Sequence, residues 1–191
     1  MSITAVWAAD KEPKFSAGPV EKYPARQTNA KVTVAASVYE TDDQARPAFG
    51  KHNPYKYGIL PILVVIQNDG NQAIRVDQIR VEYIGPDRSR LEATPANDIR
   101  YLSGGRKPNV TTGPVPTGGP RVKRGKSPLD LDAMELRAFA AKMIPPGESA
   151  SGFFYFQTGH RGGSRLYVTG ITEANSGKDL FYFEIPLPRP A

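Results

Sequence analysis

Positively charged side chains gather in one stretch of this sequence of 191 residues. Between Ile99 and Leu129 there are seven lysines and arginines and no acidic residue, while the net charge of the whole chain is +6. A cationic loop can bind phosphates, anionic lipids or an acidic protein surface through salt-sensitive contacts. The chemistry that this stretch indicates is therefore electrostatic binding, although a solvated loop kept polar for solubility is the simpler interpretation. The candidate binding residues are Arg106, Lys107, Arg121, Lys123, Arg124 and Lys126.

The composition of this basic segment also bears on the class of partner. Aromatic residues do not alternate with its charges, as they do in proteins that stack nucleobases. We therefore expect no nucleic acid as a partner. Another protein with an acidic surface, or an anionic surface of the cell envelope, fits better.

Residues that could catalyse a reaction or bind a metal are isolated in the sequence. His52 and His160 each lie in a predicted loop, and neither has a second histidine or a carboxylate at ligand spacing, so both are predicted to be surface histidines. Glu40, Asp42 and Asp43 could hold a hard cation. They lack the glycine and the later glutamate of a calcium loop, and a solvated turn is favoured.

A glycine-rich stretch at 159–164 invites comparison with a phosphate-binding loop. It lacks the Lys-Ser/Thr ending and the following helix of such loops, so a plain hairpin loop is predicted. The chain has no cysteine, which excludes disulfides and a thiolate nucleophile. No set of nucleophile, base and orienting group can be assembled. The sequence thus predicts a protein that is not an enzyme, with no metal and no cofactor.

The elements that must position these residues are predicted to be mostly strands. Eighteen glycines and eighteen prolines favour a turn-rich β protein. Four consecutive aromatic residues at 153–156 indicate a strand with both faces covered, because a half-solvated strand would alternate apolar and polar residues. Strands are predicted near residues 31–39, 60–67, 73–84, 151–157, 165–172 and 180–186, in two packed antiparallel sheets.

The region 59–84 is the most specific part of this prediction. The continuously apolar stretch 59–67 is typical of a central strand, with Pro61 at a bulge or near its start. The Asn-Asp-Gly turn at 68–70 predicts that 73–84 is the hairpin partner of this strand. Residues 73–84 change the parity of their apolar positions, which predicts a break near Asp77.

One convincing helix is predicted, at about 128–143. Ser127 resembles an N-cap with Pro128 at the first helical position, and the prolines at 145 and 146 would end the helix. Its apolar stripe is Leu129, Ala133, Leu136, Ala140 and Met143. Residues 41–57 are predicted to be a polar and aromatic connection.

The N-terminus carries a possible export signal. Val6 and Ala8 occupy the −3 and −1 positions of a signal-peptidase site that would cut before Ala9. Residues 1–29 are therefore predicted to be an N-terminal arm, extended over 10–29, or a signal-peptide remnant. Residues 30–191 are predicted to be a single β-sandwich domain with an insertion at 103–147. No apolar run approaches the roughly 18 residues of a membrane-spanning helix.

The order of these elements resembles the immunoglobulin-like β-sandwich domains of bacterial exported proteins, in particular the telokin-like lipoprotein domains. The residues that carry the resemblance are Pro146, Gly147, Glu148, Gly152, Phe153 and Phe156, with Asn68 and Gly70 upstream. The likeness covers roughly residues 30–187. The basic segment, the helix and the lack of a lipid-anchor cysteine depart from the pattern. The resemblance implies a fold and a periplasmic or extracellular location, and it carries no catalytic residue.

Two functions remain open from the sequence. The first is a non-enzymatic extracytoplasmic accessory or protein-interaction module, such as a subunit of a larger envelope assembly. The second is a carbohydrate- or small-ligand-binding module that uses exposed tyrosines, with Tyr55, Tyr57 and Tyr101 as candidates.

Overall fold

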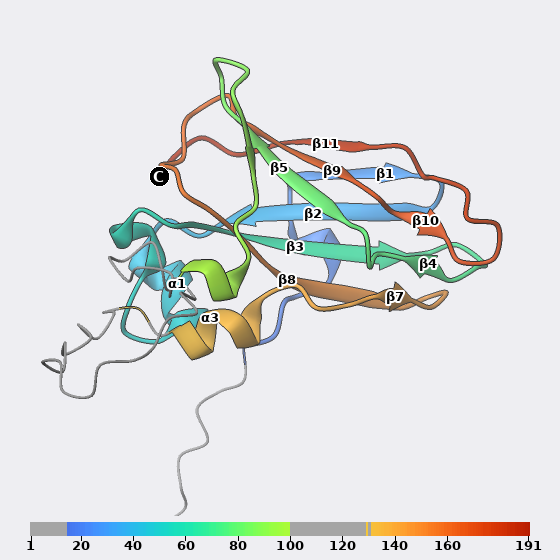
Figure 1. The fold of residues 1–191 in the computed structure, drawn as a ribbon, viewed down its shortest axis with the longest axis horizontal. Helices are drawn as coiled ribbons and strands as arrows, with labels where there is room; N and C mark the ends of the chain where they lie inside the picture. The colour runs from blue at the N-terminus through green and yellow to red at the C-terminus, as the bar shows by residue number, and fades with distance from the viewer. Residues whose placement is uncertain (1–14, 100–128, 130) are drawn as a thin grey trace, which may run out of the picture.

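The computed structural model describes residues 15–99, 129 and 131–191, and these form a mainly β structure (Figure 1). We name its three antiparallel sheets the central, outer and small sheets. The central sheet has the order β1 (Arg26–Asn29), β2 (Val32–Val38), β3 (Leu60–Asn68) and β8 (Ser149–Phe156). The outer sheet has the order β11 (Phe183–Pro186), β9 (Arg165–Thr169), β5 (Arg80–Ile84) and β6 (Arg90–Glu92). The small sheet has the order β10 (Thr172–Glu173), β4 (Ile74–Arg75) and β7 (Met143–Ile144).

The described helices are short. They are α1 (Asp42–Phe49) and α3 (Leu131–Arg137), with 3-10 turns η1 (Val20–Lys22), η2 (Pro54–Tyr57) and η3 (Ala96–Asp98). No helix of the described residues is long and apolar enough to cross a membrane.

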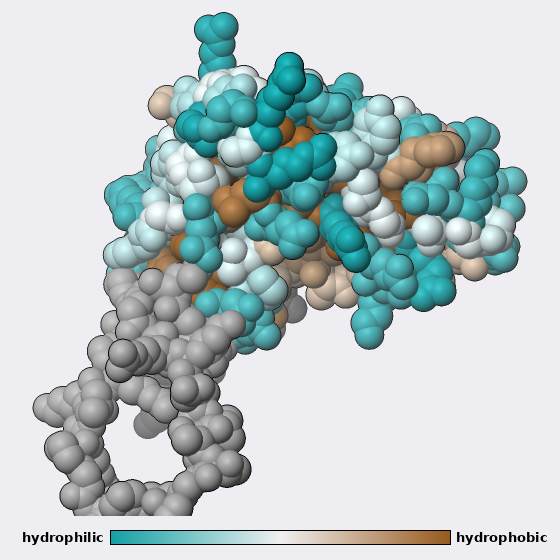
Figure 2. All heavy atoms as spheres, turned by 45° about the horizontal axis from the view of Figure 1, so that its top comes forward, coloured by the Kyte–Doolittle hydropathy of each residue, from teal (hydrophilic) through white to brown (hydrophobic). Residues whose placement is uncertain are grey.

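The strands β2 and β3 at the centre of the central sheet are buried on both faces. One face packs against the outer and small sheets in a core that includes Val64, Phe156 and Leu166. The other face packs under α1 and α3 in a second core that includes Phe153 and Tyr155. This three-layer arrangement confirms the prediction that the aromatic strand is covered on both sides. The face seen in Figure 2 is mostly hydrophilic, with hydrophobic residues visible only in small areas.

The mainly β, antiparallel character of the fold agrees with the sequence prediction, although there are three sheets among the described residues instead of two. β3 is a central strand, paired with β2 on one side and β8 on the other. Pro61 is its second residue, near the strand's start as expected. Residues 26–29 of the expected arm form the edge strand β1, which pairs with β2.

The predicted hairpin between 59–67 and 73–84 is wrong. The turn does form, because the Gly70 N–H donates to Asn68 Oδ1 at 3.0 Å. It leads the chain into the small sheet, where β4 pairs with β7 and β10, and then into the outer sheet, where β5 pairs with β6 and β9. The place beside β3 that was predicted for 73–84 is taken by β8, with eight residues in register. The predicted break near Asp77 is confirmed, since β4 ends at Arg75 and β5 begins at Arg80.

The predicted helix at 128–143 is too long. The helix α3 ends at Arg137, and Met143 belongs to strand β7. Two residues of the predicted apolar stripe are exposed, Leu136 by 77% and Met143 by 53%. The Phe139 N–H donates to the Phe153 carbonyl oxygen at 3.2 Å, so the backbone leaves the helix to bond with β8. The prolines at 145 and 146 lie in the turn between β7 and β8.

The helix α1 lies where a polar connection was predicted. Thr41 and Gln44 form a reciprocal capping box, which fixes the start of the helix. Asp42 and Asp43 lie in its first turn, where the helix dipole favours negative charge. This placement explains two of the three clustered carboxylates without a cation.

Candidate functional site

The basic residues that the sequence nominates lie outside the described residues: Arg106, Lys107, Arg121, Lys123, Arg124 and Lys126. Their surroundings are defined by the described residues on either side. Ile99 and Leu129 are both buried, and both belong to the core between the central sheet and the helices. The two described residues that flank the basic segment therefore lie on the helix-covered side of the central sheet.

The chain reaches that side by crossing the edge of β8 twice. The Thr94 N–H donates to the Tyr155 carbonyl oxygen at 2.7 Å, and the Phe139 N–H donates to the Phe153 carbonyl oxygen at 3.2 Å. We call residues 95–138, between the two crossings, the excursion. Its described parts include η3 and α3, which contact each other. The excursion is thus attached to the sandwich at alternate residues of one strand.

Gly152 makes the second crossing possible. A Cβ atom at this position would lie 2.3 Å from the Cα atom and 2.6 Å from the backbone nitrogen of Phe139. These are backbone atoms that cannot rotate away, so the close approach requires a residue without a side chain. This glycine is one of those that carry the family resemblance, and the structure gives it a packing role.

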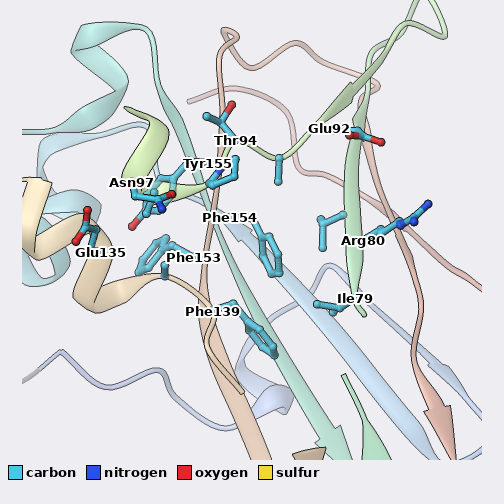
Figure 3. Close-up of a pocket in the computed structure, with 15 residues that line it drawn as sticks. Ile79, Arg80, Glu92, Thr94, Asn97, Glu135, Phe139, Phe153, Phe154 and Tyr155 are labelled. Atoms are coloured by element: carbon cyan, nitrogen blue, oxygen red, sulfur yellow. The ribbon is translucent and has the colours of Figure 1, made fainter. Parts of the chain in front are cut away.

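A groove of about 760 Å³ lies between the two crossings. It separates β5 and β6 of the outer sheet from β8 and the end of α3 (Figure 3). Its apolar lining includes Ile79, Ala93, Phe139 and Phe154, and the last two rings stack at 5.4 Å between centroids. Its polar lining consists of Arg80, Glu92, Thr94, Asn97 and Glu135.

The carboxylates in the described lining of the groove are Glu92 and Glu135. Its described lining has no histidine, cysteine or serine. The Tyr155 hydroxyl is turned away and donates to the Met134 carbonyl oxygen at 2.8 Å. Burial raises the pKa of Tyr155 well above its ordinary value, so it stays neutral and cannot act as a base. The groove can bind a ligand, since its lining offers apolar side chains together with polar ones.

His160 is buried, and the prediction of a surface histidine is wrong for this residue. Its Nε2 lies 2.8 Å from the Pro188 carbonyl oxygen, and its Nδ1 lies 3.2 Å from the Tyr83 hydroxyl. That hydroxyl donates to Ser164 Oγ at 2.6 Å and accepts from the Arg161 N–H at 2.9 Å. Tyr83 and Ser164 are buried too, so the network joins a loop and the C-terminal segment to the core. His52 is exposed, as predicted.

The carboxylates near α1 have ordinary partners. Asp42 accepts from Lys56 and Asn53, and these hydrogen bonds lower the pKa of its carboxyl group. Among the described residues, no group of three or more histidine, cysteine, aspartate or glutamate side chains could hold a metal ion.

The two described tyrosines among those nominated from the sequence differ in their exposure. Tyr55 is half-buried, and its hydroxyl accepts from the His160 N–H at 3.1 Å. Tyr57 is exposed, and Tyr101 lies outside the described residues. A different pair is stacked on the outer sheet: the rings of Tyr167 and Tyr182 lie 5.3 Å apart. The signal in the sequence was the aromatic run at 181–183, of which Phe183 is buried in β11 while Phe181 and Tyr182 precede the strand and are exposed.

No family model and no curated protein matches this chain. Among solved structures, the chain is similar to an X-ray structure of the Northeast Structural Genomics Consortium target SoR45. The TM-score is 0.35 and the sequence identity 11%, over 85% of this chain and 91% of that one. A similarity at this level carries no conclusion about fold or function.

Proposed function

We propose that this chain is a non-enzymatic protein-interaction module in which the groove holds an extended segment of a partner protein. The observation that carries the proposal is the groove itself, which combines an apolar lining with a polar one where the excursion leaves the sandwich. In the sequence, the basic segment belongs to the same excursion, between the described residues Ile99 and Leu129. Acidic residues of a partner suit the basic segment, whereas the groove, whose charged lining is Arg80, Glu92 and Glu135, suits the partner's apolar side chains.

The energetics of such a site favour one or two anchoring side chains. Burying a leucine- or phenylalanine-sized side chain contributes about 1.5–3 kcal/mol. Exposed charge pairs contribute about 0–1 kcal/mol each, so several lysines and arginines must act together. A partner segment with apolar anchors and acidic flanks would use both contributions, and its association would weaken as salt rises.

The location we propose is the periplasm or the extracellular space of a bacterium. The support is the Val6–Ala8 cleavage pattern and the resemblance to telokin-like domains of exported proteins. In this proposal the chain is an accessory subunit of a larger envelope assembly, with immunoglobulin-like topology in its β-sandwich.

The groove is tested by site-specific photo-crosslinking in the native host. A photoreactive residue replaces Asn97, which lines the groove, and in the control it replaces Asn175, an exposed residue in the turn after β10. We expect one protein to crosslink at position 97 and not at position 175, and we expect Asn97→Trp to weaken binding to that purified protein. Equal crosslinking at both positions, or no crosslinking at position 97, would contradict the proposal.

The basic segment is tested by changing Arg121, Lys123, Arg124 and Lys126 together to serine. We expect little change in thermal stability and weaker association with the crosslinked partner. Wild-type association should fall as salt rises past about 0.15 M, where the screening length is roughly 8 Å. If association is indifferent to both the substitutions and the salt, the segment is only a solvated connector.

A saccharide-binding module is the second candidate, and a specific observation favours it. Tyr182 is 49% exposed and stacks on Tyr167, and the neighbouring Phe181 is 70% exposed. Phe181 has a φ of 64°, an uncommon backbone conformation for a bulky residue. Exposed aromatic rings of this kind can stack on sugar rings. Retention on polysaccharide gels that is lost in Tyr182→Ala and kept in Tyr57→Ala would favour this candidate over the first.

A further inference from the structure

A second cavity, of about 480 Å³, lies between α1 and α3. We call it the interhelix pocket. Its described lining contains four residues that carry or can carry a positive charge, and no acidic residue. The four are Arg46, Lys51, His52 and Arg137. The rest of its described lining is apolar or glycine, so a cationic rim surrounds an apolar surface.

Arg137 is a preorganised cation in this pocket. Its Nε donates to the Ala48 carbonyl oxygen and its Nη1 to the Phe15 carbonyl oxygen, each at 3.4 Å. Its guanidinium also lies 5.5 Å from the centre of the Phe15 ring. Carbonyl oxygens and an aromatic ring hold the group in place without neutralising its charge. An anion that enters the pocket therefore meets a cation whose position is already fixed.

The other cations of the pocket are also available to a ligand. Arg46 faces Asp43 at 3.9 Å, and both side chains are exposed, so this ion pair is weak. Lys51 and His52 are exposed and form no ion pair with a carboxylate of the described residues. Asp42, the next acidic residue along α1, is already bound by Lys56.

The apolar part of the pocket includes an unusual surface residue. Leu136 is 77% exposed, although it lies in a helix whose other face is packed on the central sheet. An apolar side chain of a ligand can cover it beside the Arg137 cation. The pocket thus places a cation beside an apolar surface, which is complementary to a ligand that carries a carboxylate next to an apolar side chain.

We propose that the interhelix pocket binds an acidic and apolar segment of the partner protein, with a carboxylate toward Arg137 and Lys51 and an apolar side chain on Leu136. This inference rests on the proposed interaction function and names the partner's chemistry. The helix α3 lies between the two cavities: its Glu135 lines the groove, whereas its Leu136 and Arg137 line the pocket. One partner can therefore contact both sites across a single helix.

The first test uses two synthetic peptides and the isotopically labelled full chain. One peptide alternates glutamate with leucine, and in the control peptide glutamine replaces every glutamate. We expect saturable NMR shift changes for residues 46–52 and 133–137 with the acidic peptide, and at least fivefold weaker binding of the control. Shift changes elsewhere, or equal binding of the two peptides, would overturn the proposal.

The second test separates this pocket from a general attraction to positive charge. The variant Arg46→Gln with Lys51→Gln is compared with Lys178→Gln with Arg189→Gln, which removes the same net charge from exposed positions elsewhere. We expect the first pair to weaken acidic-peptide binding about fivefold and the second to leave it within about twofold. Leu136→Ala should weaken binding about threefold without lowering the melting temperature. Equal losses in the two paired variants would overturn the assignment.

Two further results distinguish the alternatives. Binding to phosphatidylglycerol vesicles that depends on Arg46 and Lys51, with no binding of the acidic peptide, would assign the pocket to a lipid surface and overturn the proposal. Binding of the photo-crosslinked partner is also compared among the variants. If Asn97→Trp weakens this binding and the substitutions of Arg46, Lys51 and Leu136 do not, the pocket inference fails while the proposed function stands. If no partner crosslinks near Asn97, the proposed function itself fails.

Discussion

The Tyr155 hydroxyl donates a hydrogen bond of 2.8 Å to the Met134 carbonyl oxygen, which joins the edge strand of the central sheet to α3. Both residues are buried. Tyr155→Phe removes the donor and leaves a buried carbonyl oxygen unpaired, so we expect a loss of about 1–2 kcal/mol in the free energy of unfolding. Urea denaturation measures it. Tyr167→Phe is the control, because Tyr167 is half-exposed, and it should change stability by less than about 0.5 kcal/mol.

Gly152→Ala should destabilise the protein by about 3 kcal/mol, because the new methyl group would collide with the Phe139 backbone. Hydrogen exchange should show the loss locally, as faster exchange of the Phe139 amide. Gly162→Ala is the matched control, since its nearest neighbour would be Pro190 Cδ at an ordinary 3.7 Å. Equal melting temperatures for the two variants would contradict the close approach.

His160→Ala should cost about 2–3 kcal/mol of unfolding free energy. The substitution leaves the Pro188 carbonyl oxygen without its hydrogen bond, deprives Tyr83 of a partner and opens a cavity in a buried loop. His52→Ala changes an exposed residue and should stay within about 0.5 kcal/mol. Thermal denaturation of both variants compares the two histidines directly, and similar stabilities would argue against the buried network.

Stability should fall in alkaline solution because of Tyr39. Burial, with a smaller effect of Tyr23, raises the pKa of Tyr39 to about 12. The unfolded chain has a tyrosine pKa of about 10, so ionisation favours the unfolded state as pH rises from about 10 toward 12. Below pH 10 this contribution to stability is fully present. Tyr39→Phe should flatten the decline in urea midpoint between pH 9 and 11, and an unchanged slope would contradict this cause.

The sequence was most informative where local composition and burial agree. The aromatic run at 153–156 predicted a strand covered on both faces, and its rings do enter two different cores. It was least informative about which strands pair. The residues of the turn at Asn68 are those of a hairpin turn. The strand that follows it, β4, nevertheless does not pair with β3, because β8 pairs with β3 over the full length of β8.

The helices also show what local patterns miss: α3 was predicted too long, and α1 was not predicted. The stripe that includes Leu136 and Met143 is helical in period, but bonding to β8 ends α3 at Arg137. The capping box at Thr41 and Gln44 was a readable signal for α1, and Pro47 inside the helix obscured it. As for the candidate site, the basic segment was visible in composition alone. The groove and the interhelix pocket arise from contacts between residues far apart in the chain, which no local pattern encodes.

Because the chain is bonded to β8 at Thr94 and again at Phe139, the length of the excursion does not affect the register of the strands. Carbonyl oxygens two residues apart on a strand are separated by about 7 Å, so both ends of the excursion are fixed within that short span. Doubling the length of a loop with fixed ends costs only about 0.6 kcal/mol. Residues can therefore be gained or lost between the crossings while every strand keeps its partners. The edge of β8 is thus an attachment site at which the inserted segment, and the surface residues that it carries, can change while the sandwich stays the same.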